Sequence, residues 1–88
     1  MPVSARRLIS NMIDDLNEVR DSLSLQIHLG MLEAKNELQA LGKKLDELAR
    51  RFEPLKNAAK ETGDNVWDAM QLVADEIKDG FHRIRKSL

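Results

Sequence analysis

A run of nine apolar residues, spaced alternately three and four apart, fills the middle of this sequence. Its members are Met31, Ala34, Leu38, Leu41, Leu45, Leu48, Phe52, Leu55 and Ala59. This spacing puts one apolar stripe along an α-helix and is typical of helices that pack in coiled coils or bundles. The pattern therefore predicts an all-α protein.

A second apolar run with the same spacing precedes the first. It comprises Ala5, Ile9, Met12, Leu16, Val19 and Leu23, and Ser4 is a suitable N-cap for its helix. Continued beyond Leu23, the spacing leads to Gln26 and Gly30, whereas the apolar residues are Ile27 and Met31. A one-residue insertion in the helix (a π-bulge) or a break near Gly30 accounts for this shift.

The segment 23–32 around this shift is apolar in an unusual way. Leu23, Leu25, Ile27, Leu29 and Met31 alternate with more polar residues. Such alternation is typical of a β-strand, which in a helical chain needs a strand of another chain as its partner. As a helix the segment is apolar on every side, and such a helix is buried.

The last helix is expected at about 65–87, after a turn at 62–65. In this turn Gly63 suits the position just past a helix, and Asp64 or Asn65 can cap the helix that follows. The apolar stripe of the last helix comprises Val66, Met70, Val73, Ile77, Phe81, Ile84 and Leu88, widened by Trp67 and Ala74. Pro54, within the middle run, indicates either a kink or the first turn of a new helix.

These elements predict a single domain, residues 1–88, with one long helix at about 4–61 and the last helix folded back as an antiparallel hairpin. At 1.5 Å per residue the long helix would measure about 80–90 Å, so residues 4–37 would have no partner in their own chain. A homo-oligomeric coiled-coil bundle follows, most simply a two-fold dimer. The alternative is a compact three-helix bundle with a break near Gly30, although residues 22–32 contain no Asn, Asp or Pro to form a loop.

Length and composition support assembly. A chain of 88 residues buries a limited core, and without cysteine it has neither disulfides nor a cysteine-based zinc site to stabilise it. The N-terminal segment is interrupted by polar residues too early to be a signal peptide, and no apolar run is long enough to cross a membrane. We therefore expect a cytoplasmic protein.

Little in the sequence suggests catalysis. There is no cysteine or tyrosine, and the four glycines are too far apart to form a phosphate-binding loop. Asp79 and His82 share a helix face, as metal ligands do, but this face points away from the predicted core. His28 is expected to lie in an interface as a hydrogen-bonding group. The sequence therefore predicts no enzyme, no cofactor and no metal.

We expect a self-associating helical protein that serves as an interaction or scaffold module, with a second copy or another helical protein as its partner. Two alternatives stay open: a nucleic-acid-associated helical dimer that uses basic tips (Arg6 and Arg7, then Arg83, Arg85 and Lys86), and a secreted or regulatory helical hairpin. The net charge of −1 makes nucleic acid the weaker partner. The predicted packing and oligomer interface comprises Leu16, Val19, Leu23, Leu25, Ile27, Leu29, Met31, Leu32, Leu38, Leu41, Leu45, Leu48, Phe52, Trp67, Met70, Val73, Ile77, Phe81 and Ile84.

Overall fold

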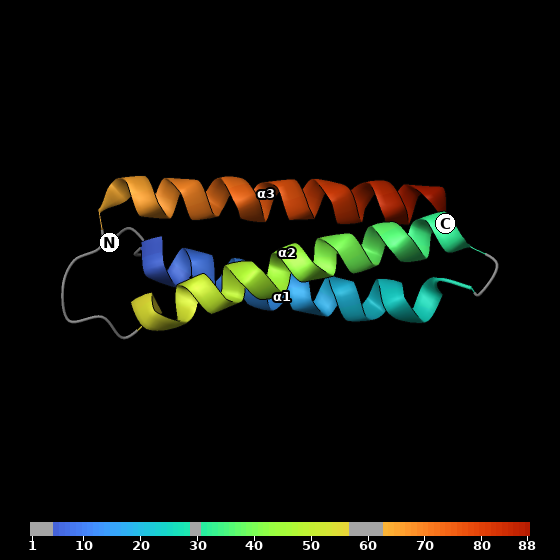
Figure 1. Cartoon of the computed structure of the whole chain (residues 1–88), viewed down its shortest axis with the longest axis horizontal. Helices are drawn as coiled ribbons and strands as arrows, with labels where there is room; N and C mark the ends of the chain where they lie inside the picture. Colours follow the sequence, from blue (N-terminus) through green and yellow to red (C-terminus); the bar gives the residue numbers. More distant parts are fainter. Residues whose placement is uncertain (1–4, 29–30, 57–62) are drawn as a thin grey trace.

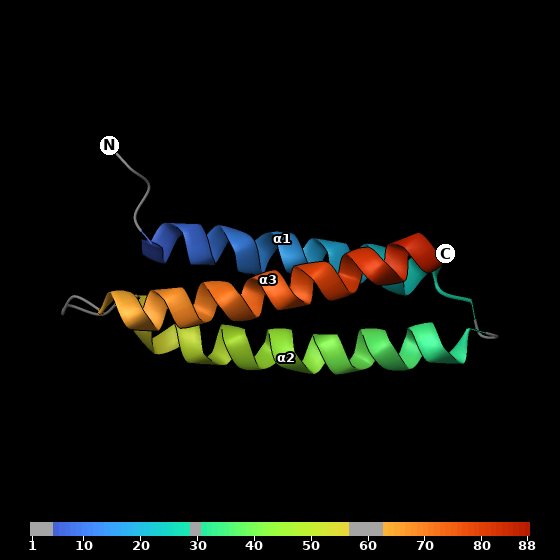
Figure 2. The same cartoon turned by 90° about the horizontal axis from the view of Figure 1, so that it is seen from above.

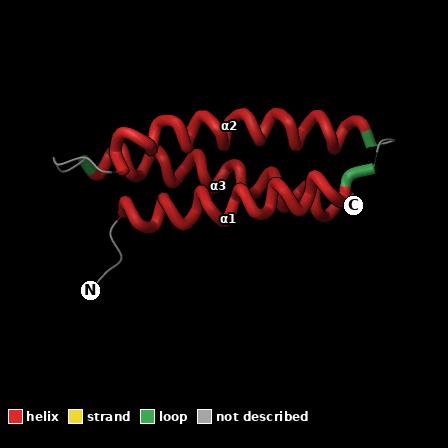
Figure 3. The backbone as a smooth tube through the Cα atoms, turned by 90° about the horizontal axis from the view of Figure 1, so that it is seen from below, coloured by secondary structure: helices red, strands yellow, loops and turns green. Residues whose placement is uncertain are grey.

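The computed structural model describes residues 5–28, 31–56 and 63–88 and shows three helices. These are α1 (Ala5–Gln26), α2 (Leu32–Lys56) and α3 (Asp64–Ser87). The described residues contain no strand (Figure 3). In Figure 1, α1 and α3 run in the same direction and α2 runs in the opposite direction. Helix α1 therefore begins at one end of the bundle and α3 ends at the other.

Each helix packs against the other two, and α3 lies over the groove between α1 and α2 (Figure 2). The core consists of the side chains that face the common axis. They are Ile9, Ile13, Leu16, Leu23, Ala34, Leu38, Leu41, Leu45, Leu48, Phe52, Trp67, Met70, Ala74, Ile77, Phe81 and Ile84. The all-α class predicted from the sequence is confirmed, and the architecture is the compact three-helix bundle that was the alternative.

The single long helix at 4–61 is wrong, because α1 ends at Gln26 and α2 begins at Leu32. The N–H of Ile27 donates to the carbonyl of Leu23 at 3.0 Å, which closes the last turn of α1. The N–H of Met31 then donates to the carbonyl of His28 at 2.9 Å, just before α2 begins. The shift of the apolar pattern marks this change of helix.

Because α1 contacts both α2 and α3, it has packing partners within its own chain, which the predicted hairpin would not have provided. The described part of 4–37 therefore has packing partners without a second chain. The strand alternative is also wrong for the described part of 23–32, where Leu23 is in α1 and Leu32 in α2. Leu29 and Gly30 lie outside the described residues.

The wide apolar stripe of α3 follows from its place against two helices. Its buried residues cover a broader arc than one partner requires, and Trp67 and Ala74 are among them. Phe52 of α2 meets Trp67 edge to face, with 6.2 Å between ring centroids and 61° between ring planes. This aromatic pair fixes the level of α3 relative to α2 near one end of the bundle.

Gly80 allows α3 to come close to α2 nearer the other end. A Cβ atom at this position would lie 2.5 Å and 2.8 Å from the two methyl carbons of Leu41, which is closer than van der Waals contact allows. The glycine lowers the helix propensity of α3, and it makes room for a buried leucine. The sequence pattern showed only the loss of propensity.

The helix ends differ from the expected caps. Gly63 is the N-cap of α3 with an extended backbone (φ −62°, ψ 148°), its carbonyl accepts from the N–H of Val66 at 3.0 Å, and no side chain makes a cap hydrogen bond. Helix α2 continues through Pro54 to Lys56, so Pro54 starts no new helix. Ser4 and Ala59 lie outside the described residues. Among the described helices none is long and apolar enough to cross a membrane.

Candidate functional site

An open groove of about 500 Å³ lies between α2 and α3. Its floor is apolar and comprises Leu48, Met70 and Val73, with Val66 and Ala69 along the α3 side. Ala69 is small, and the half-buried Val73 lies at the margin of the α3 stripe, so side chains leave this edge of the core uncovered. The groove is thus an apolar strip on the outside of a finished core.

Charged and polar groups form the rim of this groove. They are Lys44, Glu47 and Arg51 on α2, and Asn65 and Glu76 on α3. Arg51 donates to Glu47 at 3.0 Å across one helical turn, and both side chains are well exposed. Lys44 has no ion-pair partner among the described residues. An apolar floor with a charged rim is the usual composition of a surface that binds another protein.

Leu72 lies on the outer face of α3, beside the groove, and its exposed fraction is 65%. Asp68, four residues earlier, and Asp75, three residues later, are exposed on the same side of the helix. A large leucine between two aspartates contributes nothing to the core of its own chain. It is an exposed apolar side chain with no partner in the described part of the bundle.

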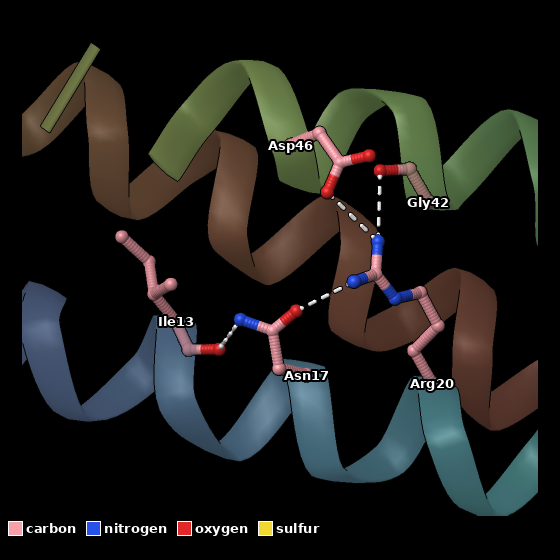
Figure 4. Close-up of polar contacts among 5 residues, drawn as sticks. All are labelled: Ile13, Asn17, Arg20, Gly42 and Asp46. Atoms are coloured by element: carbon pink, nitrogen blue, oxygen red, sulfur yellow. Dashed lines mark hydrogen bonds and ion pairs between the residues drawn. The ribbon is translucent and has the colours of Figure 1, made fainter. Parts of the chain in front are cut away.

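The opposite edge of α2, facing α1, is bridged by polar contacts (Figure 4), and these contacts line a smaller hollow of about 360 Å³. Arg20 of α1 donates to the carboxylate of Asp46 at 2.9 Å and to the carbonyl of Gly42 at 3.4 Å. A second nitrogen of Arg20 donates to the side-chain oxygen of Asn17 at 2.9 Å, and Asn17 donates to the carbonyl of Ile13 at 3.1 Å. The stem of Arg20 lies over Gly42, since a Cβ there would be 3.4 Å from the arginine Cδ.

A second apolar surface lies where α1 ends and α2 begins. Leu25 is 88% exposed and Leu32 is 64% exposed, while Ile27 and Met31 are partly buried against the core. The C-terminal end of α3 reaches the same end of the bundle (Figure 1), and Leu88 there is also exposed. The segment that the sequence predicted to be apolar on every side therefore divides into buried and exposed residues.

Most of the predicted interface residues are buried within this one chain. Twelve are in the core: Leu16, Leu23, Leu38, Leu41, Leu45, Leu48, Phe52, Trp67, Met70, Ile77, Phe81 and Ile84. Four are partly buried, namely Val19, Ile27, Met31 and Val73. Leu25 and Leu32 are exposed, and Leu29 lies outside the described residues. The apolar spacing located the core of the bundle.

The residues weighed as chemical groups do not form a site in the described structure. Asp79 and His82 are both exposed, and no three ligating side chains come together among the described residues. His28 is exposed beyond the end of α1, and its predicted place in an interface stays a prediction. Trp67 is buried against Phe52 and thus belongs to the core.

The basic tips do not form one surface. Arg6 and Arg7 lie at the start of α1, whereas Arg83, Arg85 and Lys86 lie at the end of α3, which is the opposite end of the bundle (Figure 1). A single stretch of nucleic acid phosphates would have to follow the length of the molecule to contact both groups. The structure thus offers no shared basic patch at these residues.

Three residues matter here that the sequence pattern passed over. Ile13 is buried although it lies off the first apolar run. On α3, Ala69 lines the groove and Leu72 is exposed, and both lie off the apolar stripe. A signal for Leu72 was present in its flanking aspartates, because a large apolar residue within an acidic helix face contributes nothing to solvation. Comparisons with protein-family models, curated proteins and solved structures find no match for this chain.

Proposed function

We propose that this chain is a non-enzymatic, self-associating helical protein that serves as an interaction or scaffold module. The observation that carries the proposal is the exposed Leu72 beside an apolar groove, both left over after the three helices have completed a core. Exposed apolar surface with a polar rim marks binding sites for other proteins.

The size of the bundle adds support. A domain of 88 residues buries a modest fraction of its unfolded surface, so further burial between chains is a large gain relative to its own stability. Self-association is the simplest form of this gain because each copy brings the same surfaces at the same concentration. A different helical protein with an apolar face is the second candidate partner.

Sedimentation equilibrium of the whole chain tests self-association. We expect a mass close to 10.0 kDa at low concentration that rises toward twice this value with increasing concentration. The range should extend from about 1 µM to about 500 µM, which covers weak and strong dimers. A mass that stays at one chain over the whole range contradicts the proposal. Cytoplasmic location and the lack of catalysis stay predictions.

A further inference from the structure

Two triplets of residues on the α2–α3 side of the bundle have the same spacing and opposite charge. They are Lys44, Leu48 and Arg51 on α2, called the basic triplet, and Asp68, Leu72 and Asp75 on α3, called the acidic triplet. In each triplet a leucine follows one charged residue by four positions and precedes the other by three. Residues at this spacing share one side of a helix. Leu72 is exposed between its two aspartates, whereas Leu48 is buried beneath its two cations and contributes to the floor of the groove.

Both triplets are available to a partner. Lys44 and Arg51 are exposed on the rim of the groove, above the floor to which Leu48 contributes. Leu72 is 65% exposed and its two aspartates are exposed, with no ion pair to either among the described residues. At about 100° per residue, Leu72 is turned by about 60–100° from Ala69 and Val73, so it points away from the groove of its own chain.

The two triplets also lie at matching levels along the bundle. Phe52 of α2 and Trp67 of α3 are in contact and therefore lie at the same level of two antiparallel helices. Arg51 is one residue before Phe52 and Asp68 one residue after Trp67, so these two charges are level. Lys44 lies eight residues before Phe52 and Asp75 lies eight residues after Trp67, so these two charges are level as well.

We propose that the α2–α3 groove is occupied by α3 of a second copy, in a parallel two-fold dimer whose axis runs along the bundle. This inference rests on the proposed self-association and names its surface. In such a dimer α3 packs beside its counterpart at the same level, and Leu72 of each copy enters the groove of the other. The acidic triplet of each copy then faces the basic triplet of the other, twice per dimer.

Charge distinguishes this arrangement from the antiparallel one. A two-fold axis perpendicular to the helices would bring groove against groove and Leu72 against Leu72. Each basic triplet would then face a basic triplet, and each acidic triplet an acidic one. Like charges across an interface disfavour association, so the antiparallel dimer is opposed by the charges that favour the parallel one.

Charge reversal tests the pairing of triplets. One variant carries Asp68→Lys and Asp75→Lys, and the other carries Lys44→Glu and Arg51→Glu. Each variant alone places like charges across both halves of the interface, and we expect its homodimer to be weakened about tenfold or more. An equimolar mixture restores opposite charges in both halves, and we expect heterodimers of about the original affinity.

Asp14→Lys with Asp21→Lys is the matched control for the variant with Asp68→Lys and Asp75→Lys. These exposed residues of α1 have the same seven-residue spacing as Asp68 and Asp75, and their substitution gives the same change in net charge. We expect this variant to dimerise as the original chain does. Circular dichroism establishes that every variant keeps its helices. Homodimers of unchanged affinity, or a mixture that fails to associate when both variants are folded, would overturn the proposal.

Disulfide cross-linking tests the direction, since the chain has no cysteine of its own. Asn65 and Glu76 lie on one side of α3, eleven residues apart, at the rim of the groove. In a parallel dimer Asn65→Cys and Glu76→Cys each meet their own counterpart, and we expect both variants to form cross-linked dimers. In an antiparallel dimer both positions cannot meet their counterparts, so cross-linking at one position only contradicts the proposed direction.

The outcomes separate this inference from the proposed function. A chain that is monomeric at every concentration contradicts both. A chain that dimerises, but whose affinity responds to neither charge reversal nor Leu72→Gln, self-associates through another surface, and only the groove assignment is wrong. In that case the exposed Leu25 and Leu32 identify the next surface to substitute.

Discussion

The two edges of α2 differ in how the core beside them is covered. Toward α1 the edge is bridged by Arg20, whose stem lies on Gly42 and whose guanidinium donates to Asp46, Asn17 and the Gly42 carbonyl (Figure 4). Toward α3 the edge is an apolar groove, whose rim charges do not reach across the floor to form an ion pair between the two helices. The hollow at the α1 edge, about 360 Å³, is thus crossed by polar contacts, whereas the hollow at the α3 edge, about 500 Å³, has an apolar floor that no such contact between described residues crosses.

The two edges differ in what their arginine side chains contact. An arginine that covers a glycine satisfies a backbone carbonyl and keeps its charge at the surface, so that edge gains little from a further partner. At the open edge the arginine, Arg51, pairs with Glu47 on its own helix and leaves the floor uncovered. We take such an open edge as the mark of a binding surface.

The largest expected effect concerns the core that both edges share. Leu45 is fully buried, and Leu45→Ala should lower the free energy of unfolding by about 2–5 kcal/mol, because it removes apolar contacts and leaves a cavity. Chemical denaturation in a Leu72→Gln background measures this without a contribution from the proposed dimer. Leu25→Ala is the control, and its 88% exposure predicts a change below about 0.5 kcal/mol. Equal losses in the two variants would contradict the assigned core.

The next effect concerns the close approach of α2 and α3 at the far end of the open edge. Gly80→Ala should lower stability by about 1 kcal/mol, because the new Cβ displaces the methyl groups of Leu41. In a Leu41→Ala background the same substitution should raise stability by about 1 kcal/mol through helix propensity. Thermal and chemical denaturation of the original chain, the two single variants and the double variant give the coupling free energy between the two positions. Stabilisation by Gly80→Ala in both backgrounds would show that residues 80 and 41 do not crowd each other.

A smaller effect is expected at the α1 edge, which Arg20 bridges. Arg20→Ala should cost about 1 kcal/mol, which combines a partly exposed ion pair with the packing of the stem on Gly42. Arg20→Met keeps the apolar stem and should recover about half of this loss. Denaturation at low and high salt separates the two parts, since only the ion pair is screened. If Met and Ala are equivalent, the stem does not contribute to stability at this edge.

The smallest effect on folding is expected at the rim of the open edge. Glu47→Gln removes an exposed pair within one helix and should change the free energy of unfolding by less than about 0.5 kcal/mol. The same substitution frees Arg51 for the acidic triplet of a second copy, so we expect the dimer to become about two- to threefold tighter. Sedimentation equilibrium measures this, and a weaker dimer would argue against a role for Arg51 in the interface.

The sequence was a reliable guide to the helices and a poor one to the connection between the first two. The three-four spacing located α2 and α3 and most of the core, because burial on one face imposes that period. The shift between Leu23 and Ile27 was a true signal of discontinuity. The compact bundle was disfavoured because the segment lacks Asn, Asp and Pro, yet the structure turns there with Leu25 and Leu32 exposed.

The candidate site was harder to predict because it depends on two helices at once. Periodicity identifies residues that face the core, whereas Leu72 and the rim of the groove are defined by what the core leaves out. The sequence alone could not show that Lys44 and Asp75 lie at the same level, because this follows from the contact between Phe52 and Trp67 in the folded bundle. The equal spacing of the two triplets is visible in the sequence, but the relative position of α2 and α3 along the bundle is not.

An odd number of helices gives the molecule a polarity. Helix α1 begins at one end and α3 ends at the other (Figure 1), so the two ends of the rod are chemically different. In the proposed parallel dimer both copies of each end lie together, separated from the opposite pair by the length of α3, about 36 Å at 1.5 Å per residue. Such a dimer is directional: it holds the two copies of the start of α1 at a set distance from the two copies of the end of α3.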